Sequence, residues 1–161
     1  MKSILTLRHA KSSWKHPELN DHDRPLNKRG KRDAPLMGEL LKNELLIPEF
    51  IISSDAKRAH STAKIVAKAA GYKGEIALNQ AIYAARPPAY IDVLRNLSNE
   101  YTRVLMIGHN PGLEELVSML TVKVTVCLHA HLYIFNYAST NGLNWIIKLK
   151  ETYLGYGTHA I

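Results

Sequence analysis

The chain has 161 residues, of which 46% are hydrophobic and 22% are charged. This composition is typical of a globular protein and excludes a disordered or fibrous chain, and the length suits a single domain over residues 1–161 with its own core. The formal net charge of +7 favours anionic ligands such as phosphate esters, phosphoproteins, nucleic acids or acidic membrane surfaces, without choosing among them.

Cysteine content and hydropathy indicate the compartment. The one cysteine, Cys127, cannot form an intrachain disulfide, which favours a reducing environment, and we interpret it as a small buried hydrophobic residue. The apolar stretch from Met1 to Leu7 is too short for the hydrophobic part of a signal peptide, and no run of residues approaches the length of a membrane span. We therefore expect a soluble cytoplasmic protein that does not bind membranes.

Hydrophobic patterning predicts strands that alternate with helices along the chain. Strands are expected at residues 3–7, 49–53, 75–78, 103–107, 132–137 and 143–149, and helices at residues 28–43, 55–70, 89–97 and 111–120. Pro35 is expected to kink or restart the first helix because proline lacks a backbone donor, and Gly71 is expected to end the second. Asn141-Gly142 predicts the turn of a C-terminal hairpin.

This order of elements predicts the fold class. Strands and helices that alternate favour a three-layer α/β/α fold, in which a mainly parallel central sheet lies between two layers of helices. The C-terminal hairpin would add antiparallel strands at one edge of that sheet.

Polar residues follow three of the predicted buried strands. Arg8-His9 comes after the first, Ser53-Ser54-Asp55 with Arg58 after the second, and Gly108-His109-Asn110 after the strand at 103–107. In open α/β sheets ligands bind outside the carboxyl ends of the strands. We therefore expect the three clusters to meet at one site.

Arg58 occupies an unusual position for a cation. Ser54 or Asp55 is expected to cap the helix, which puts Arg58 in its first turn with Lys57 beside it. The amino end of a helix favours negative charge, so two cations there are unfavourable unless an anion compensates them. We interpret Arg58 as a ligand for an anion instead of a solvated surface residue.

The third cluster adds a second helix start. Asn110 can serve as the cap and Pro111 as the first helical residue, and the backbone donors of such a helix start favour an anion. His109 and Asn110 are therefore candidate phosphate ligands, together with Lys11.

His9 is the candidate nucleophile. A neutral imidazole can attack phosphorus and form a covalent phosphoramidate, which divides one difficult transfer into two easier ones. Arg8, Arg58 and His109 would surround the phosphate oxygens, a role that suits arginine because it stays cationic and presents a planar fork of donors. With cationic side chains around the phosphate no metal is needed, and the sequence has neither zinc-like Cys/His spacing nor a Walker loop.

Two histidines near the C-terminus form a further pattern. His129 and His131 fall on one face of a strand, a spacing that could hold a metal. Two ligands alone rarely make a metal site, so we interpret the pair as structural or solvent-facing.

The motifs together resemble the histidine phosphatase superfamily, which has the phosphoglycerate mutase-like fold. The stretches that carry the resemblance are, in chain order, Leu7-Arg8-His9-Ala10-Lys11, Asp23-Arg24-Pro25-Leu26-Asn27-Lys28-Arg29-Gly30, Ser53-Ser54-Asp55-Ala56-Lys57-Arg58-Ala59 with Thr62-Ala63, and Gly108-His109-Asn110-Pro111-Gly112. The short SixA-type branch, the phosphohistidine phosphatases, is the most similar. The resemblance implies a phosphatase with His9 as nucleophile, with Arg8, Arg58 and His109 as the phosphate pocket, and with neither a metal nor an organic cofactor.

The proton donor departs from the family pattern. Larger members carry a glutamate after the third strand, whereas residues 81–86 of this chain contain no carboxylate. Asp21 or Asp23, in the loop before Arg24-Pro25, are the replacement candidates, and we favour Asp21. Such an acid needs a raised pKa, which an arginine-rich pocket opposes. If the substrate is phosphohistidine, its imidazole leaves well enough to make a strong acid unnecessary.

Protein phosphohistidine is the favoured substrate, because a short chain without a long insertion over the site leaves it open to a protein-borne phosphate. A small phosphate ester, or a non-catalytic phosphate-binding module, is the alternative. The basic run Lys28-Arg29 and Lys31-Arg32 is interpreted as a solvated helix face, since no stacking aromatic residues are interleaved with it. We therefore expect no nucleic-acid partner, and nothing in the sequence indicates an oligomeric state.

Overall fold

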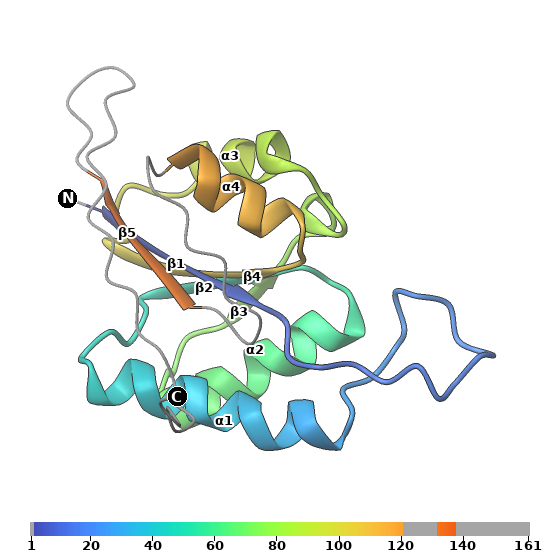
Figure 1. Ribbon diagram of the computed structural model, residues 1–161. Coiled ribbons are helices and arrows are strands. Elements are labelled where there is room, and N and C mark those ends of the chain that lie inside the picture. The colour runs from blue at the N-terminus through green and yellow to red at the C-terminus, as the bar shows by residue number, and fades with distance from the viewer. Residues whose placement is uncertain (1, 121–131, 138–161) are drawn as a thin grey trace, which may run out of the picture.

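The computed structural model describes residues 2–120 and 132–137 (Figure 1). The elements follow the predicted order: β1 (Lys2–Arg8), α1 (Lys28–Asn43), β2 (Phe50–Ser53), α2 (Lys57–Ala70), β3 (Ile76–Leu78), a short 3-10 helix (Gln80–Ile82), α3 (Pro87–Arg95), β4 (Arg103–Gly108), α4 (Gly112–Leu120) and β5 (Leu132–Tyr137). No helix within these two ranges is both long and apolar enough to cross a membrane.

The strands form one sheet in the order β3-β2-β4-β1-β5. The first four are parallel to their neighbours, and β5 runs antiparallel to β1 at the edge. The mixed α/β architecture with a mainly parallel sheet is therefore confirmed. The predicted hairpin turn at Asn141-Gly142 and the strand at 143–149 lie outside the described residues, as do Cys127, His129 and His131.

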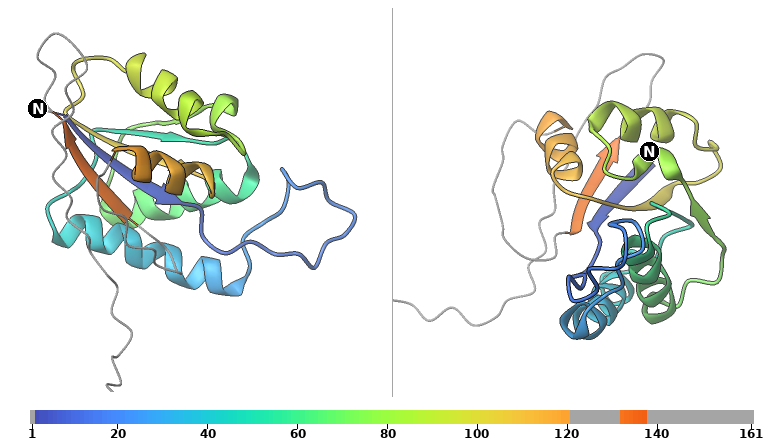
Figure 2. Two further views of the ribbon diagram at one scale, coloured as in Figure 1. Left: turned by 45° about the horizontal axis from the view of Figure 1, so that its top comes forward. Right: turned by 90° about the vertical axis from the view of Figure 1, so that its right-hand side faces the viewer.

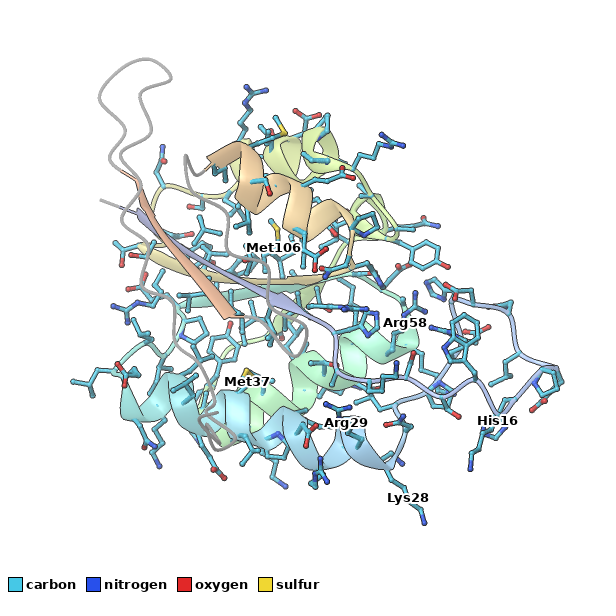
Figure 3. All side chains as sticks on the ribbon, in the orientation of Figure 1. His16, Lys28, Arg29, Met37, Arg58 and Met106 are labelled. Atoms are coloured by element: carbon cyan, nitrogen blue, oxygen red, sulfur yellow. The ribbon has the colours of Figure 1, made fainter. Side chains whose placement is uncertain are left out.

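Helices cover both faces of the sheet, α1 and α2 on one side and α3 and α4 on the other (Figures 1 and 2). Alternate residues of the parallel strands supply the two cores, since successive strand side chains point to opposite faces. Leu5 and Leu105 pack with the helices of the first face, and Ile4 and Val104 with those of the second. Figure 3 shows Met37 and Met106 on opposite sides of the sheet.

Helix α1 starts at a cap that the sequence specifies. The side chain of Asn27 accepts a hydrogen bond from Gly30 N at 2.8 Å. The expected restart at Pro35 does not occur, and one helix runs from Lys28 to Asn43. The helix packs closely against α2: a Cβ on Gly38 would lie 2.4 Å from Val66 O, so only glycine permits this approach of the two helices.

Helix α2 ends as expected at Gly71, whose φ of 77° lies in the left-handed region that glycine tolerates. Its start differs from the prediction, since the cap is Ala56 without a side-chain bond. The expected cap by Ser54 or Asp55 is wrong because both side chains have other partners: Ser54 Oγ contacts the ring of His109, and Asp55 pairs with His22 at 3.1 Å.

Strand register brings the three polar clusters to one edge. Arg8 lies beside Gly108, and Ser53 beside Ile107, so the residues after β1, β2 and β4 are neighbours. The chain continues from β1 to α1 on one face and from β4 to α4 on the other, and such a divergence leaves room for a ligand. The connection from β1 to α1, residues 9–27, projects beyond this edge (Figure 1).

Candidate active site

His9 follows β1 directly, and its backbone N donates to Gly108 O at 3.0 Å. Its Nδ1 lies 2.8 Å from Ala10 O. Because a carbonyl oxygen only accepts, Nδ1 carries the ring proton and Nε2 keeps a lone pair. Arg58 Nε donates to that Nε2 at 3.2 Å. The fold thus fixes the tautomer in which Nε2 can act as a nucleophile.

The surroundings of His9 keep its ring neutral. Burial, the largest cause, and the positive charges of Arg58, Arg8 and Arg24 together lower its pKa from 6.5 to about 4, against the opposing effect of the bond to Ala10 O. At neutral pH the imidazole is therefore in its unprotonated, nucleophilic form.

Arg58 links the groups of the site. Its side chain is buried, with 5% exposed, and Figure 3 shows it at the carboxyl edge of the sheet. In addition to His9 it bonds with NH2 to Asp21 Oδ2 at 2.9 Å and lies 3.4 Å from His109 Nδ1, and its NH1 donates to Asp21 O. Asp21 thus supplies, within the chain itself, an anion that compensates the positive charge of Arg58 in the first turn of α2.

His109 approaches His9 from β4, with ring centroids 5.0 Å apart. Since Arg58 donates toward Nδ1, the proton of His109 sits on Nε2, which lies 2.9 Å from Ser54 Oγ. Burial, with the nearby His9 and Arg58, lowers the pKa of His109 from 6.5 to about 3. The hydroxyl of the buried Tyr90 accepts from His109 N at 3.1 Å and fixes the end of β4.

Three further predicted ligands lie beside these groups. Arg8 is the exposed last residue of β1, and Lys11 is an exposed residue whose carbonyl accepts from Asn27 N at 3.0 Å. Asn110 is half-buried, and its amide donates to Glu114 Oε1. The expected start of α4, with Asn110 as cap and Pro111 as first helical residue, is wrong, since the helix begins at Gly112.

Asp21 is held as a carboxylate. Its Oδ2 accepts from Tyr83 OH at 2.7 Å, and its Oδ1 lies 3.3 Å from Arg24 Nε. The Tyr83 bond, followed by Arg58 and Arg24, lowers the pKa of Asp21, although partial burial opposes the shift. This environment suits an anchor for arginine better than a proton donor. Asp23, the other candidate acid, lies 3.6 Å from His22 Nδ1.

Tyr83 is a site residue that the sequence reasoning missed. It follows the 3-10 helix, and its ring lies edge-on to His109 and His22 at 5.4 and 5.0 Å. Tyr83 lies in residues 81–86, which contain no carboxylate, and its hydroxyl in that stretch is the signal that could have indicated it.

Arg24 was also missed, as was its contact with Trp14, which lies outside the group of His9, Arg58 and His109. Arg24 is 7% exposed, donates from NH2 to Ser12 Oγ at 2.9 Å, and lies beneath the Trp14 ring, with Cζ 3.3 Å from the centroid. Its Nε is close enough to Asp21 for an ion pair but not aligned for a hydrogen bond. An arginine three residues after Asp21 is the signal that could have found this contact.

The segment after His9 is joined to α2 by Thr62. Its buried Oγ1 accepts from Ala10 N at 3.0 Å and donates to Arg58 O at 2.7 Å. One hydroxyl therefore bonds to the backbones of the residue after the candidate nucleophile and of the candidate phosphate ligand. Within residues 2–120 and 132–137, no three His, Cys, Asp or Glu side chains are grouped so that they could hold a metal ion.

Comparison with known proteins gives the family. Residues 4–81 match the histidine phosphatase superfamily (branch 1). An uncharacterized chloroplastic protein of Arabidopsis thaliana is 34% identical over 146 residues, which cover 83% of this chain and 67% of that protein. The chain belongs to the histidine phosphatase superfamily. An uncharacterized protein of Mycobacterium tuberculosis is 32% identical over 115 residues, which cover 71% of this chain and 69% of that one.

Solved structures of the superfamily share the fold. SixA from Agrobacterium tumefaciens aligns with a TM-score of 0.75 and 25% identity, over 84% of this chain and 91% of that one. A protein histidine phosphatase SixA in complex with tungstate aligns with the same TM-score at 22% identity, over 84% and 88% of the two chains, which shows the fold alone. Membership of the superfamily and the likeness to SixA from Agrobacterium tumefaciens support a phosphatase.

Proposed function

We propose that this chain is a protein phosphohistidine phosphatase that works through a covalent phospho-His9 intermediate. The observation that carries the proposal is the group formed by His9, Arg58 and His109. A neutral imidazole with its lone pair on Nε2 lies within hydrogen-bond distance of a buried guanidinium, which also approaches the second histidine. This group combines a nucleophile with donors for phosphate oxygens.

In the first step, His9 Nε2 attacks phosphorus. The Nε2–P bond forms while the bond from phosphorus to the substrate's leaving atom breaks, and the leaving imidazole departs neutral when its other nitrogen already carries a proton. Arg58 turns its Nε–H from His9 to a phosphate oxygen, assisted by Arg8, Asn110 and Lys11, while His109 Nδ1 accepts from Arg58 NH2 and positions the guanidinium. The carbonyl of Ala10 accepts a hydrogen bond from Nδ1–H of His9 and stabilises the positive charge that forms on the ring.

In the second step, water replaces His9. The water oxygen bonds to phosphorus, the P–Nε2 bond breaks, and the electron pair returns to Nε2. The proton of the water passes to the phosphate that is released. The fixed tautomer of His9 is restored in this step, because Nδ1 keeps its proton throughout and donates it in a hydrogen bond to Ala10 O.

Phosphohistidine is favoured because the described site offers no carboxyl placed to give up a proton. Asp21 is the carboxylate beside Arg58, and its pKa is lowered. Alkyl phosphate esters leave as strongly basic alkoxides and need such a donor. A protonated phosphohistidine ring leaves without one, which supports an N-phosphoryl substrate over a small alkyl ester.

The test is rapid-quench labelling with a histidine-phosphorylated protein, in which an alkaline denaturant stops the reaction. Phosphate should appear on His9 within one turnover, in a linkage that acid cleaves and alkali does not, and His9→Ala should abolish both label and turnover. Full turnover by His9→Ala would contradict the covalent mechanism. A parallel panel of phosphoserine, phosphotyrosine and sugar phosphates tests the substrate class, and an unchanged rate in EDTA tests the proposed independence of metal.

A further inference from the structure

Trp14 is exposed beside the candidate active site. It lies in the connection 9–27 that projects past the carboxyl edge of the sheet, on the same projection as His16, which Figure 3 labels. Its side chain is 73% exposed, and it is the only aromatic residue among the large hydrophobic residues on the described surface. An exposed tryptophan is costly in water and is common where proteins bind each other.

The Trp14 ring rests on a fixed support. Arg24 beneath it is buried, bonded to Ser12 and paired with Asp21, while its Nε and NH1 lack aligned hydrogen-bond acceptors in the described structure. Stacking on a guanidinium that is itself held in place orders the indole before any partner arrives. A residue ordered in advance loses little entropy on binding, which favours its use as an anchor.

Trp14 is connected to the candidate nucleophile through three side chains. Arg24 lies 3.3 Å from both the Trp14 ring and Asp21, Asp21 lies 2.9 Å from Arg58, and Arg58 lies 3.2 Å from His9. A protein that carries a phosphoryl group offers a surface large enough to contact the indole while its phosphorus lies at His9.

Charge around the site is unevenly neutralised. The acidic side chains nearby each lie within ion-pair distance of an arginine or a histidine: Glu18 with His16, Asp21 with Arg58 and Arg24, and Asp23 and Asp55 with His22. Four exposed cations on the same segments have no ion pair within the described part of the chain: Arg8, Lys11, Lys15 and Lys57. The surplus is positive and complements an acidic partner surface.

We infer that residues 11–23, with Trp14 as apolar anchor and Lys15 and Lys57 as flanking charges, form a docking surface for an acidic protein that presents its phosphoryl group to His9. The inference rests on the proposed phosphatase function. A protein fits better than a nucleic acid, because one indole stacked on arginine offers no row of aromatic platforms for successive bases.

The experiment compares an acidic protein domain phosphorylated on histidine with a small aryl phosphate. Trp14→Ala should raise KM for the phosphoprotein about tenfold or more, as for an interface anchor, and leave kcat and the aryl phosphate rate within about twofold. Trp14→Phe should recover part of the loss. Met119 is an exposed residue at the far end of α4, so Met119→Ala is the matched control and should leave the kinetic constants for both substrates unchanged.

Charge reversal tests the contribution of the flanking lysines to the docking surface. Lys15→Glu should raise KM for the phosphoprotein and flatten its dependence on salt, because one attractive pair becomes repulsive. Lys73→Glu is the control, since Lys73 is exposed between α2 and β3 at the opposite end of the strands. Equal effects of the two variants would show a general effect of net charge and overturn the assignment.

Binding to the His9→Ala variant separates docking from catalysis. In that background Trp14→Ala should weaken the measured Kd for the phosphoprotein about tenfold, whether or not wild-type protein hydrolyses it. An unchanged Kd would overturn the docking surface. An equal loss of kcat/KM for both substrates in the active enzyme would also overturn it, because Trp14 would then act by supporting Arg24 and Asp21 in the active site. Competition by oligonucleotides with steep salt dependence would assign the surface to nucleic acid instead. Failure of wild type to hydrolyse either substrate would contradict only the proposed function.

Discussion

Arg58 Nε lies 3.2 Å from His9 Nε2, so the guanidinium suited to hold a phosphate also bonds to the lone pair that would attack it. The two roles exclude each other, because Nε2 must be free before it can bond to phosphorus. An arriving phosphate would therefore draw Arg58 away and release the nucleophile in the same movement. The contacts of Arg58 with Asp21 can persist meanwhile, since they use NH1 and NH2.

Histidine titration should separate three rings of this site. His9 and His109, whose pKa values are lowered to about 4 and about 3, should keep the NMR shifts of neutral imidazole at pH 5.5. His22, whose pKa is raised by Asp55 and Asp23, should titrate above 6.5. Substitution of each histidine in turn assigns the signals, and protonation of His9 near pH 6.5 would contradict the burial argument.

The same shifts make stability depend on pH. In the unfolded chain His9 and His109 bind protons near pH 6.5, whereas in the folded chain they bind them near 4 and 3. The unfolded state therefore holds more protons in this window, and their contribution to the free energy of unfolding, present above pH 6.5, is lost as the pH falls toward 4. Urea titrations of wild type and His109→Asn across this range check the sign.

Tyr83→Phe should raise the pKa of Asp21. The Tyr83 hydroxyl, 2.7 Å from Oδ2, is the largest cause of the lowered value, and phenylalanine keeps the ring against His109 and His22 while removing the donor. Carbon-13 NMR of the Asp21 carboxyl measures the change. Tyr72→Phe, which removes a hydroxyl bonded to Glu75 O far from the site, should leave it unaltered. An unchanged pKa of Asp21 in Tyr83→Phe would mean that the arginines alone keep this carboxyl ionised.

Asp21→Asn tests whether this residue positions Arg58 or supplies a proton. As a partner of Arg58 it should lower kcat/KM about tenfold, on the scale of one charged hydrogen bond at a half-exposed side chain, and by the same factor for good and poor leaving groups. A loss that grows with the basicity of the leaving group would instead make Asp21 the acid. Asp23→Asn should stay within about twofold, because the ion pair of Asp23 is with His22.

The sequence was sufficient to bring His9, Arg58 and His109 together. Each follows a strand whose buried residues alternate between two cores, and the carboxyl ends of parallel strands must meet at one edge. A pattern of this kind depends only on neighbouring residues, so it can be recognised in the sequence without knowledge of the packing. The same reasoning explains why the helix ranges and the end of α2 at Gly71 were predicted well, whereas the amino-terminal caps were not, since Ser54 and Asn110 have partners that only the fold supplies.

The contacts of Tyr83 and Arg24 could not be predicted from sequence patterns of this kind. Tyr83 bonds to a carboxylate 62 positions earlier in the chain, and no periodicity relates the two. Arg24 is buried by Trp14 in a loop, where composition suggests only a turn. Contacts between loops depend on how the whole chain closes, so sequence patterns that describe strands and helices do not reach them.

Thr62→Val should weaken both the fold and the site. It removes the acceptor of Ala10 N and the donor to Arg58 O in a buried position, which leaves a backbone donor unpaired and costs about 1–3 kcal/mol of unfolding free energy. Urea denaturation measures the loss. Ser118→Ala, which removes an exposed helix hydroxyl, should cost less than about 0.5 kcal/mol. Equal losses of unfolding free energy in the two variants would show that the two hydrogen bonds of Thr62 Oγ1 stabilise the fold no more than an exposed hydroxyl does.

Gly112→Ala should disturb the site through its backbone. A Cβ at this position would lie 1.9 Å from Ala85 O, and backbone cannot swing aside as a side chain can, so α4 or the segment after Tyr83 must move. We expect a loss of about 1–3 kcal/mol in unfolding free energy and a lower kcat/KM, because a shifted Tyr83 loses its bond to Asp21. Gly74→Ala is the control, since the nearest atoms there are the end of the Tyr72 side chain, which can rotate away. Full activity and wild-type stability in Gly112→Ala would show that the start of α4 does not depend on this close approach.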